Sequence, residues 1–360
     1  MEPLKEMFNK NYYLHFAQEM QKVYKNFNPE KFVKDVTLNF ESLSLNERMR
    51  NTSITLKKHL PDDYKKTILI LSDVITRTNR NYTNLVFPDF VGLYGHDDFT
   101  TSLNALKHFT QFGSSEFAIR EFLRRDFNKT IKVMNIWAKD KNAHVRRLAS
   151  EGSRPRLPWS FKLDEVIKNP KSTQSILEIL KADEELYVKK SVANHLNDIS
   201  KDNTQQMIQL IKSWDKTNLH TAWIVKHASR TLIKKGNTQS LAIFDFEKNP
   251  KLKLEKFKII KPKLKLGEHL EFEFSLTSEK NTSQKLVIDY IIHYQKKGAE
   301  LSAKVFKLKE ITLKPKEKIS ISKKQVLKDF STRKHFSGLH YLEIQVNGKV
   351  LNKQPFHLNV

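Results

Sequence analysis

Three acidic residues, Glu116, Glu151 and Asp198, lie in stretches of this chain that are otherwise suited to binding phosphate. The densest of these stretches runs from His144 to Trp159 and holds four arginines, one carboxylate and one tryptophan. A carboxylate repels a phosphate, so its presence there needs an offsetting benefit. It either pairs with a neighbouring arginine or stabilises positive charge that arises on a bound ligand.

The second of these roles is a chemical one. Cleavage of an N-glycosidic bond passes through an oxocarbenium-like sugar, and paired carboxylates stabilise such a transition state in glycoside hydrolysis. Trp159 fits the same chemistry, because an aromatic face attracts a cationic base by about 0.5–2 kcal/mol. Simpler interpretations stay open. Glu116 suits the start of a helix and Glu151 an ion pair with Arg147. Asp198 suits a solvated helix face, and Trp159 a place in the core.

Other kinds of site have less support in the sequence. The absence of cysteine excludes disulfides, a thiol nucleophile and thiolate metal sites. The 13 histidines show no metal-binding spacing, and the nine glycines form no phosphate-binding motif. We therefore expect no metal and no other cofactor. His195 and His227, both on predicted helices, are expected to pack or to contact phosphate.

The charge of the chain favours a polyanionic partner. Its 64 Lys+Arg residues against 40 Asp+Glu residues give a net charge of +24. Nucleic acid is the leading candidate and an anionic membrane the second. Apolar runs such as residues 68–71 are far shorter than the roughly 20 residues that span a bilayer. The N-terminus is charged and lacks the apolar segment of a secretory signal, so we expect a cytoplasmic protein, associated with the nucleoid when it acts.

Residues 1 to about 240 show successive amphipathic helices with short polar breaks, which predicts an all-α domain. Three segments, 145–149, 188–193 and 224–230, place basic residues between apolar ones at the same point of a helix. The segments begin 43 and 36 residues apart. This spacing is typical of helix-pair repeats of the HEAT kind, in which equivalent helices line one surface.

The third segment continues as Lys226, Arg230 and Lys234, which stand at i, i+4 and i+8. Like charges at this spacing cost about 0.2–0.5 kcal/mol per pair. A single helix of this kind is as compatible with a solvated basic face as with a binding surface. Three such helices in register favour a surface that binds phosphate.

The helix in the densest stretch is expected to bury the stripe that begins at Val145 and ends at Gly152. Gly152 and Pro155 should end this helix, since glycine accepts the left-handed conformation of a helix end and proline cannot continue the hydrogen-bond ladder. A constrained loop should then carry Trp159 beside Glu151.

After residue 240 the pattern changes to the period-two alternation of strands. Six runs show it: 252–254, 270–274, 286–291, 305–308, 319–321 and 341–346. Asn347-Gly348 is a strong hairpin signal, because a type I′ turn needs positive φ at both central residues. We predict a linker over 241–250 and an immunoglobulin-like sandwich over 251–360. Its many lysines either contact DNA or protect edge strands from aggregation.

Four segments carry a resemblance to a known family: 87–91, 114–120, 146–159 and 191–202. They resemble the AlkC branch of the HEAT-like-repeat DNA glycosylases, relatives of AlkD. The run from Arg147 to Arg156 is long and specific, and the resemblance covers residues 1 to about 240. An immunoglobulin-like C-terminal domain is also known in part of that branch.

The resemblance implies a monofunctional glycosylase that removes cationic N3-alkylated bases, chiefly 3-methyladenine and 3-methylcytosine, from duplex DNA. It implies that Glu116, Glu151 and Asp198 are catalytic and that Trp159 contacts the lesion. Asp198 would stabilise the oxocarbenium and orient water, while the two glutamates complement the cationic base. The residues expected to bind DNA are Arg120, Arg147, Arg154, Arg156, Lys189, Lys190, Asn194, Lys226, His227, Arg230 and Lys234.

Two other classes of function remain open at this stage. In a non-catalytic nucleic-acid scaffold, the carboxylates would do no more than pair with arginines. A protein-interaction solenoid would bind DNA weakly, with a shallow dependence on salt. We expect a monomer that acts on double-stranded DNA, at no membrane.

Overall fold

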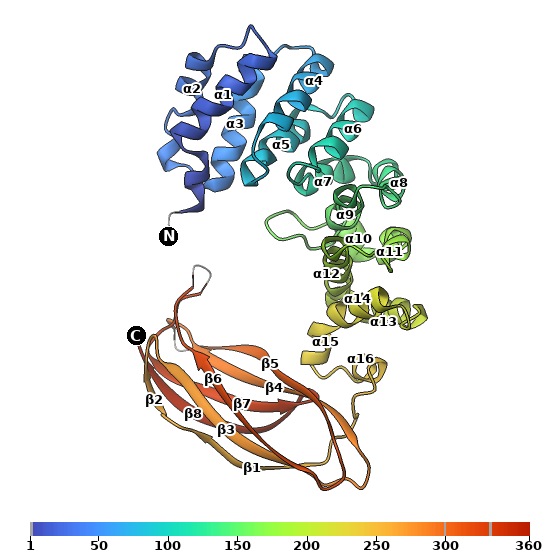
Figure 1. Cartoon of the computed structure of the whole chain (residues 1–360), viewed down its shortest axis with the longest axis vertical. Helices are drawn as coiled ribbons and strands as arrows, with labels where there is room; N and C mark the ends of the chain where they lie inside the picture. Colours follow the sequence, from blue (N-terminus) through green and yellow to red (C-terminus); the bar gives the residue numbers. More distant parts are fainter. Residues whose placement is uncertain (1–2, 299, 331–332) are drawn as a thin grey trace. The chain divides into compact units, whose positions relative to one another are not determined.

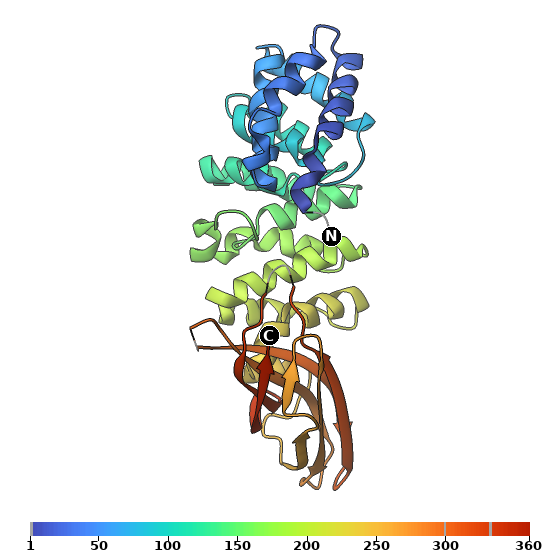
Figure 2. The same cartoon turned by 90° about the vertical axis from the view of Figure 1, so that its left-hand side faces the viewer.

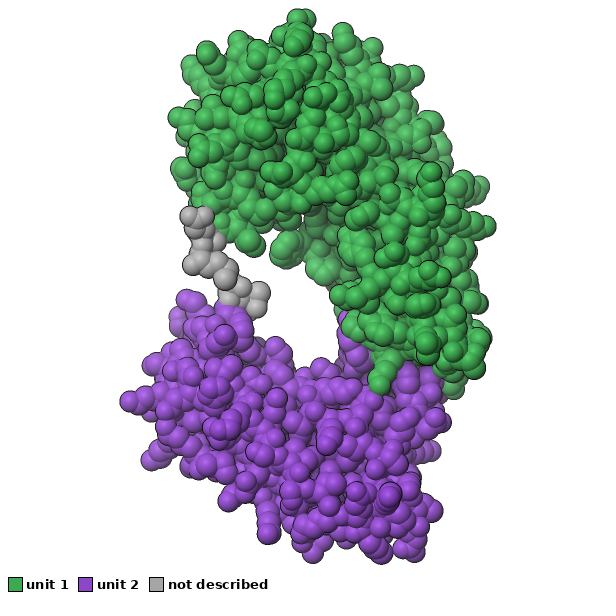
Figure 3. Space-filling model, in the orientation of Figure 1, with its two compact units in different colours: residues 1–228 green, residues 229–360 purple. Residues whose placement is uncertain are grey.

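The computed structural model describes residues 3–298, 300–330 and 333–360 of the chain. These residues form two compact units, Met1–Ala228 and Ser229–Val360, which Figure 3 draws in different colours. The first unit is helical, and the second is dominated by β-strands. The prediction of an all-α domain followed by an all-β sandwich is confirmed.

The first unit consists of α-helices and short 3₁₀ helices, which are labelled η. In chain order they are η1 (Leu4–Phe8), α1 (Lys10–Val23), α2 (Pro29–Val36), η2 (Phe40–Ser42), α3 (Leu45–His59), α4 (Tyr64–Val74), η3 (Ile75–Arg77), η4 (Tyr82–Leu85), α5 (Val86–Tyr94), α6 (Phe99–Phe109), α7 (Glu116–Arg125), α8 (Phe127–Trp137), α9 (Ala143–Gly152), α10 (Asp164–Lys168), η5 (Pro170–Thr173), α11 (Gln174–Leu180), α12 (Leu186–Asp202), α13 (Thr204–Ser213) and α14 (Leu219–Ala228).

Polar side chains begin many of these helices, because the first backbone N–H groups of a helix have no partner within it. Asn28 caps α2 by accepting from Lys31 N, and Pro29 occupies the first helical position. Asp63 caps α4 by accepting from Lys66 N. The local sequence therefore fixes where these two helices begin.

The helices of the first unit stack into two rows, as expected for HEAT-like repeats. One row consists of α3, α5, α7, α9, α12 and α14, each packed against the next. In the other row, α1 packs against α4, α4 against α6, and α8 against α11. Figures 1 and 2 show the helices following one another along the unit in the order of the sequence. The three basic segments predicted to be equivalent lie on neighbouring helices, α9, α12 and α14, of the first row.

The second unit begins with two short helices, α15 (Arg230–Lys234) and α16 (Thr238–Ile243), and its described residues continue as eight strands. The strands are β1 (Leu252–Ile259), β2 (Lys263–Lys265), β3 (His269–Ser278), β4 (Gln284–Gln295), β5 (Leu301–Leu313), β6 (Lys318–Val326), β7 (Gly338–Val346) and β8 (Lys349–Asn359). All six alternating runs of the sequence fall within strands. The three-residue strand β2 was not expected, because a segment so short shows little alternation.

The strands form two sheets, ordered β1-β3-β6 and β2-β8-β7-β4-β5. All pairs are antiparallel except β2 and β8, which are parallel. The turn between β7 and β8 is the predicted hairpin, with φ of 46° at Asn347 and 81° at Gly348. Both values are positive, as a type I′ turn requires.

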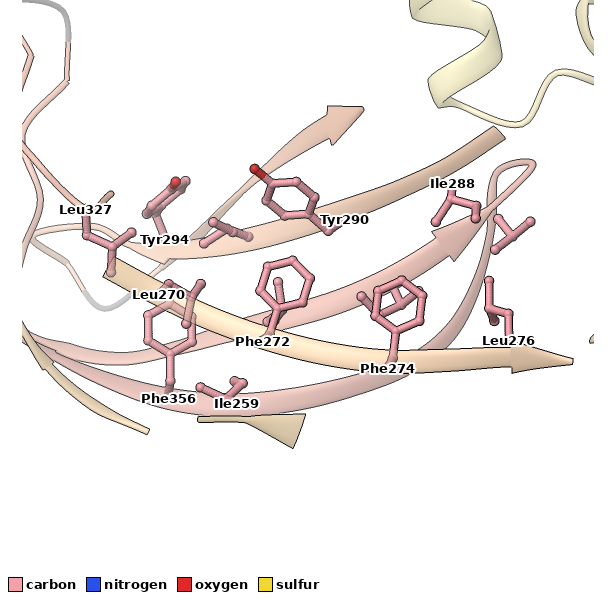
Figure 4. Packing of buried hydrophobic residues seen from close by; sticks show 14 of the residues in the cluster. Ile259, Leu270, Phe272, Phe274, Leu276, Ile288, Tyr290, Tyr294, Leu327 and Phe356 are labelled. Carbon is pink, nitrogen blue, oxygen red and sulfur yellow. The ribbon is translucent and has the colours of Figure 1, made fainter. Parts of the chain in front are cut away.

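The core of the sandwich lies between the two sheets. Phe272 and Phe274 of β3 face Tyr290 of β4 and Phe356 of β8, and all four are at most 2% exposed (Figure 4). Alternate residues of β3 point into this core, so the period-two pattern of the sequence marks its buried face. This packing of two sheets around one core agrees with the predicted immunoglobulin-like sandwich.

The compact units differ from the expected ranges, 1–240 for the helical domain and 241–250 for a linker. Helices α15 and α16 belong to the second unit, because Ile233, Leu241 and Phe246 are buried in one cluster with Val287 of β4. Apolar burial of this kind packs Ile233, Leu241 and Phe246 against strand β4.

Candidate active site

The three candidate carboxylates lie on neighbouring helices of one row. Glu116 begins α7, Glu151 is the second-last residue of α9, and Asp198 lies within α12. Helix α7 packs against α9, and α9 packs against α12. Glu116 and Asp198 therefore belong to one site, although they are 82 positions apart in the sequence. The sequence predicted these residues but not the contacts between them.

Two serines fix the start of α7. Ser115 is buried and donates its hydroxyl to the carbonyl of Leu106 at 2.8 Å, so it does not cap the helix with its side chain. Ser114 instead donates to Glu116 Oε2 at 2.6 Å. The expected helix start is confirmed, and the serine contact holds the Glu116 carboxylate in one orientation.

Helix α9 ends at Gly152, as predicted, but for a different physical reason. Gly152 does not have the positive φ that was expected. A Cβ at this position would lie 2.4 Å from Ile119 Cγ2 of α7 and 3.3 Å from Met134 Cε. Only glycine therefore permits this close approach of α9 to α7, which brings Glu151 close to Glu116.

Arg147 links the two glutamates. Its Nη1 donates to Glu116 and, at 2.9 Å, to the Ser114 hydroxyl, while its Nη2 lies 3.4 Å from Glu151 Oε1. The guanidinium also lies 4.7 Å from the centre of the Tyr187 ring. Burial alone would lower the pKa of Arg147, but the two carboxylates outweigh it and raise that pKa above its ordinary value.

Arg154 links Glu151 to Asp198. Its Nη1 donates to Glu151 Oε1 at 2.6 Å, and its Nε donates to Asp198 Oδ2 at 2.8 Å. Lys201 donates to the other oxygen of Asp198 at 2.8 Å. Burial would lower the pKa of Arg154, but Glu151 and Asp198 raise it. A chain of alternating charges thus runs from Glu116 to Lys201.

A cavity of about 350 Å³ opens beside this chain. Glu116, Glu151, Arg154 and Trp159 line it. Asp198 is not among the described residues that line this cavity. It is only 2% exposed, because Arg154 and Lys201 cover both of its carboxylate oxygens.

Trp159 lies on the loop 153–163, which joins α9 to α10 and projects away from the helices of the first unit (Figure 1). Its backbone is left-handed, with φ of 64°, and its side chain is 73% exposed. A bulky residue rarely adopts this conformation, so the surrounding structure must impose it. The interpretation of Trp159 as a core residue is therefore wrong.

Arg120 imposes much of the path of this loop. Its guanidinium donates to the carbonyls of Gly152 at 3.0 Å, Arg154 at 2.6 Å and Phe161. Arg120 is fully buried, and burial together with the nearby Arg154 lowers its pKa to about 10. The prediction that Arg120 contacts DNA is corrected here, because a buried guanidinium bonded to three carbonyls does not reach a phosphate.

The same correction applies to the two arginines of the charge chain. Arg147 and Arg154 were expected to contact phosphate, but their side chains are only 13% and 9% exposed and are paired with carboxylates. Arg156 is 26% exposed and makes a two-pronged ion pair with Asp202 at 2.7 and 2.6 Å. In this structure these three arginines serve internal contacts.

The remaining residues expected to bind DNA in the first unit lie on α12 and α14. Lys190 and Lys226 are exposed, and Asn194 is half-buried. Lys189 lies 2.9 Å from His220 Nδ1 and 5.9 Å from the centre of the Trp223 ring. His227 stacks on Trp223 at 4.9 Å. Their contact with DNA remains a prediction.

Arg230 and Lys234 belong to the second unit. The single helix expected from Lys226 to Lys234 is divided at Ser229, where α14 ends and α15 follows. Lys234 donates to the carbonyl of Val305 at 3.1 Å, so its ammonium group contacts the sandwich. The expected row of three cations on one helix is corrected accordingly.

His195 is a packing residue, one of the two roles expected for it. It is fully buried, its Nδ1 lies 3.0 Å from the Ser150 carbonyl and its Nε2 lies 3.2 Å from the Thr173 hydroxyl. Burial and the nearby Arg154 lower its pKa to about 3, so the imidazole is neutral. His195 thereby holds the residue that precedes Glu151.

Sequence reasoning missed Ser114 and Lys201 as partners of the carboxylates, and Tyr187 as a partner of Arg147. The Ser114 hydroxyl could have been found from its position two residues before Glu116, and Lys201 from its spacing three residues after Asp198. Tyr187 gives no such signal, because it reaches Arg147 from another helix.

The described residues contain no group of three or more acidic, histidine or cysteine side chains that could hold a metal ion. None of their helices is long and apolar enough to cross a membrane.

Two family models match the chain. The model described as DNA alkylation repair enzyme matches residues 108–232, and that described as the C-terminal Ig-like domain of the uncharacterised protein YhaZ matches residues 253–360. The uncharacterized protein YhaZ of Bacillus subtilis (strain 168) is 39% identical over 359 residues, which cover 99% of this chain and 100% of that protein. A solved structure, the Pseudomonas fluorescens alkylpurine DNA glycosylase AlkC bound to DNA containing an abasic site analog, is similar over 100% of both chains, with a TM-score of 0.96 and 45% identity.

Proposed function

The chain belongs to the AlkC family of DNA alkylation repair enzymes, and on this premise we propose that it is a DNA glycosylase for cationic N3-alkylated bases in duplex DNA. Its substrates are chiefly 3-methyladenine and 3-methylcytosine, and its product is an abasic site. The enzyme acts as a monomer in the cytoplasm, at the nucleoid, and its own residues suffice without a cofactor. One observation carries the proposal, namely three carboxylates joined by arginines beside a cavity that also holds an exposed tryptophan.

The reaction consists of bond cleavage and capture by water. As the N-glycosidic bond breaks, its electron pair leaves with the base and neutralises the positive charge of the base. The deoxyribose is left as an oxocarbenium-like cation, and water attacks it at C1′. A proton of that water passes to a proton-accepting side chain. Carboxylates stabilise the cation electrostatically and can accept this proton.

The positions of the side chains suggest a division of labour. Glu116 and Glu151 line the cavity, where their charge complements the cationic base before the bond breaks. The exposed indole of Trp159 offers its face to the same base. We assign to Asp198 the stabilisation of the sugar and the orientation of water, which requires Arg154 and Lys201 to move from its oxygens.

Binding of the duplex supplies a reason for such movement. DNA phosphates compete with Asp198 for the half-exposed ammonium of Lys201. The exposed Lys190 and Lys226 lie on the same row of helices and suit contact with the DNA backbone. The chain's net charge of +24 favours this association.

One observation favours a second candidate, a non-catalytic nucleic-acid scaffold. Each of the three carboxylates is paired with a cation, as that alternative requires. A scaffold would bind DNA through the same basic surface and release no base.

Release of free 3-methyladenine from methylated duplex DNA under single-turnover conditions distinguishes the two candidates. Wild type should release the base, and Glu151→Gln and Asp198→Asn should slow release about 10²- to 10³-fold, as for the loss of an electrostatic stabiliser. Glu30→Gln, the same change at an exposed site on α2, is the control and should leave the rate unchanged. No release by wild type, together with tight and salt-dependent binding of DNA, would support the scaffold. Full release by both site variants would refute the assigned roles.

A further inference from the structure

A second cavity, of about 590 Å³, lies beside the candidate active site. Residues of α3, α5, α7 and the loop 153–163 line it, and none of the three candidate carboxylates does. Trp159 and Phe117 line both cavities. These two side chains therefore form the partition between the two cavities. A ligand that contacts this partition from one cavity lies close to the other cavity.

The second cavity carries more positive than negative charge. Arg50, Arg124 and Arg125 line it, against Asp89 and Glu121. Arg50 is held by an ion pair with Asp89 Oδ1 at 2.9 Å, yet its side chain remains 49% exposed. Arg124 is 61% exposed. Exposed guanidinium groups held in place by a carboxylate suit a phosphate, which they can bind through two parallel hydrogen bonds.

The interior of this cavity suits a planar heterocycle. Phe161 and Leu93 provide apolar surface, and the exposed indole of Trp159 provides an aromatic face for stacking. Arg124 lies 4.7 Å from the centre of the Phe161 ring and so fixes its position. Stacking on an aromatic side chain contributes to the binding of every nucleobase, whatever its identity.

Two polar atoms of the lining lack hydrogen-bond partners among the described residues. Asp89 has a side chain only 9% exposed, and its Oδ2 accepts no hydrogen bond. The nearby Ser53 hydroxyl donates instead to carbonyls of Met49 and Val86. His96 Nδ1 is likewise buried and makes no hydrogen bond of normal geometry with the described residues. Buried polar atoms are normally paired, so these two indicate a ligand with its own donors and acceptors, such as the edge of a nucleobase.

We propose that this second cavity holds a nucleotide of the bound DNA other than the lesion. Its base lies between Trp159 and Phe161, and its phosphate contacts Arg50 and Arg124. The proposal rests on the proposed function, because it takes damaged duplex DNA as the ligand. A nucleotide held there would keep the helix open beside the lesion, which leaves the Glu116 side of the partition to the damaged base.

Photocrosslinking of the full-length protein tests this proposal. The probes are two duplexes with one abasic-site analogue each, which carry 5-iodouracil either opposite the analogue or next to it. Such duplexes have no base at the lesion, so any crosslinked base comes from another nucleotide. Phe161 lines only the second cavity, whereas Tyr82 and Tyr187 line only the candidate active site.

A crosslink from either probe to Phe161, identified by mass spectrometry, supports the proposal and shows which strand supplies the nucleotide. Arg50→Gln should reduce the yield of that crosslink about tenfold, because a charged hydrogen-bond donor to the phosphate is lost. Arg77→Gln is the matched control, since Arg77 is 43% exposed, pairs with Asp73 and does not line the cavity. It should leave the yield unchanged.

Crosslinks confined to Tyr82 or Tyr187, or equal yields from the two arginine variants, would overturn the proposal. Failure of the proposed function is detected separately, as the absence of free base from methylated DNA. The two failures are distinguishable because the crosslinking duplexes contain no base that could be excised.

Discussion

Arg120 places its charge inside the first unit, where its guanidinium donates to three backbone carbonyls on the two sides of Trp159 in the chain. Replacing it with methionine removes every one of these donors while keeping most of the apolar volume. Breaking a buried charged contact on one side costs about 3–5 kcal/mol. We expect Arg120→Met to lower the free energy of unfolding by about this amount, measured by urea denaturation.

The control for this prediction is Arg77→Met, a change at a 43% exposed side chain, which should shift stability by less than about 0.5 kcal/mol. A direct contact of Arg120 with phosphate would give a different result. In that case stability would change little, and the dependence of DNA affinity on salt would become shallower by about one charge.

The residue types of the site could be read from the sequence, but their partners could not. Glu116, Glu151 and Asp198 stand out because carboxylates are unexpected on a basic surface. Arg154, on the predicted loop, and Lys190, on a predicted helix, look alike in the sequence as cations of a basic surface. Only the packing of α9 against α12 shows that Arg154 is enclosed by carboxylates while Lys190 faces solvent.

Helix α9 approaches α7 closely because Gly152 has no side chain. An alanine there would place its Cβ 2.4 Å from Ile119 Cγ2. We expect Gly152→Ala to cost about 1–3 kcal/mol of stability, as in other overpacked cores, and to displace Glu151 relative to Glu116. Thermal unfolding and the rate of base release measure the two effects.

The double variant Gly152→Ala with Ile119→Ala provides the check on this cause. Removing the isoleucine side chain leaves room for the new methyl group, so the double variant should lose less stability than the sum of the two single variants. Additive losses would show that the contact with Ile119 does not explain the need for glycine at this position.

Strand β4 carries a buried acid, Asp289, which is 1% exposed and lies close to α15. Burial raises its pKa to about 6, against the opposing influence of Lys234. A folded pKa above the unfolded value means that the folded state binds the proton more tightly. The contribution of this proton to the free energy of unfolding is therefore fully present below about pH 4. It is lost as the pH rises through about 6.

We expect Asp289→Asn to stabilise the second unit by about 2–3 kcal/mol at pH 7.5, because the amide never acquires the buried charge. At pH 5 the gain should be about half as large. Melting temperatures at the two pH values measure this difference, and Asp62→Asn, at a fully exposed site, is the control. An equal gain at both pH values would mean that the charge of Asp289 is not the cause.

At the scale of elements, the sequence predicts structure where one local cause dominates. Asn347-Gly348 predicts its hairpin because only a few residues accept positive φ. The division between α14 and α15 at Ser229 has no such signal, because the apolar spacing continues through it. The burial of Leu241 and Phe246 against β4, which decides the extent of the second unit, depends on contacts distant in sequence.

The net charge of +24 does not measure how many cations the molecule offers to DNA. Arg120, Arg147 and Arg154 are enclosed within the first unit and engaged there. Lys190, by contrast, is exposed on α12. Sequence composition predicts the sign of the partner's charge. It does not predict how many cations contact that partner, because it cannot separate enclosed cations from exposed ones.

The dependence of DNA affinity on salt separates them experimentally. Each phosphate contact contributes about 0.9 to the slope of log affinity against log salt concentration. We expect Lys190→Gln to make this slope shallower by about one unit, and Lys132→Gln, at an exposed site on α8 in the other row of helices, to leave it unchanged. Fluorescence anisotropy over a range of salt concentrations gives the slopes. Equal effects of the two variants would mean that DNA senses only the total charge of the molecule, and that the row formed by α9, α12 and α14 is not a specific binding surface.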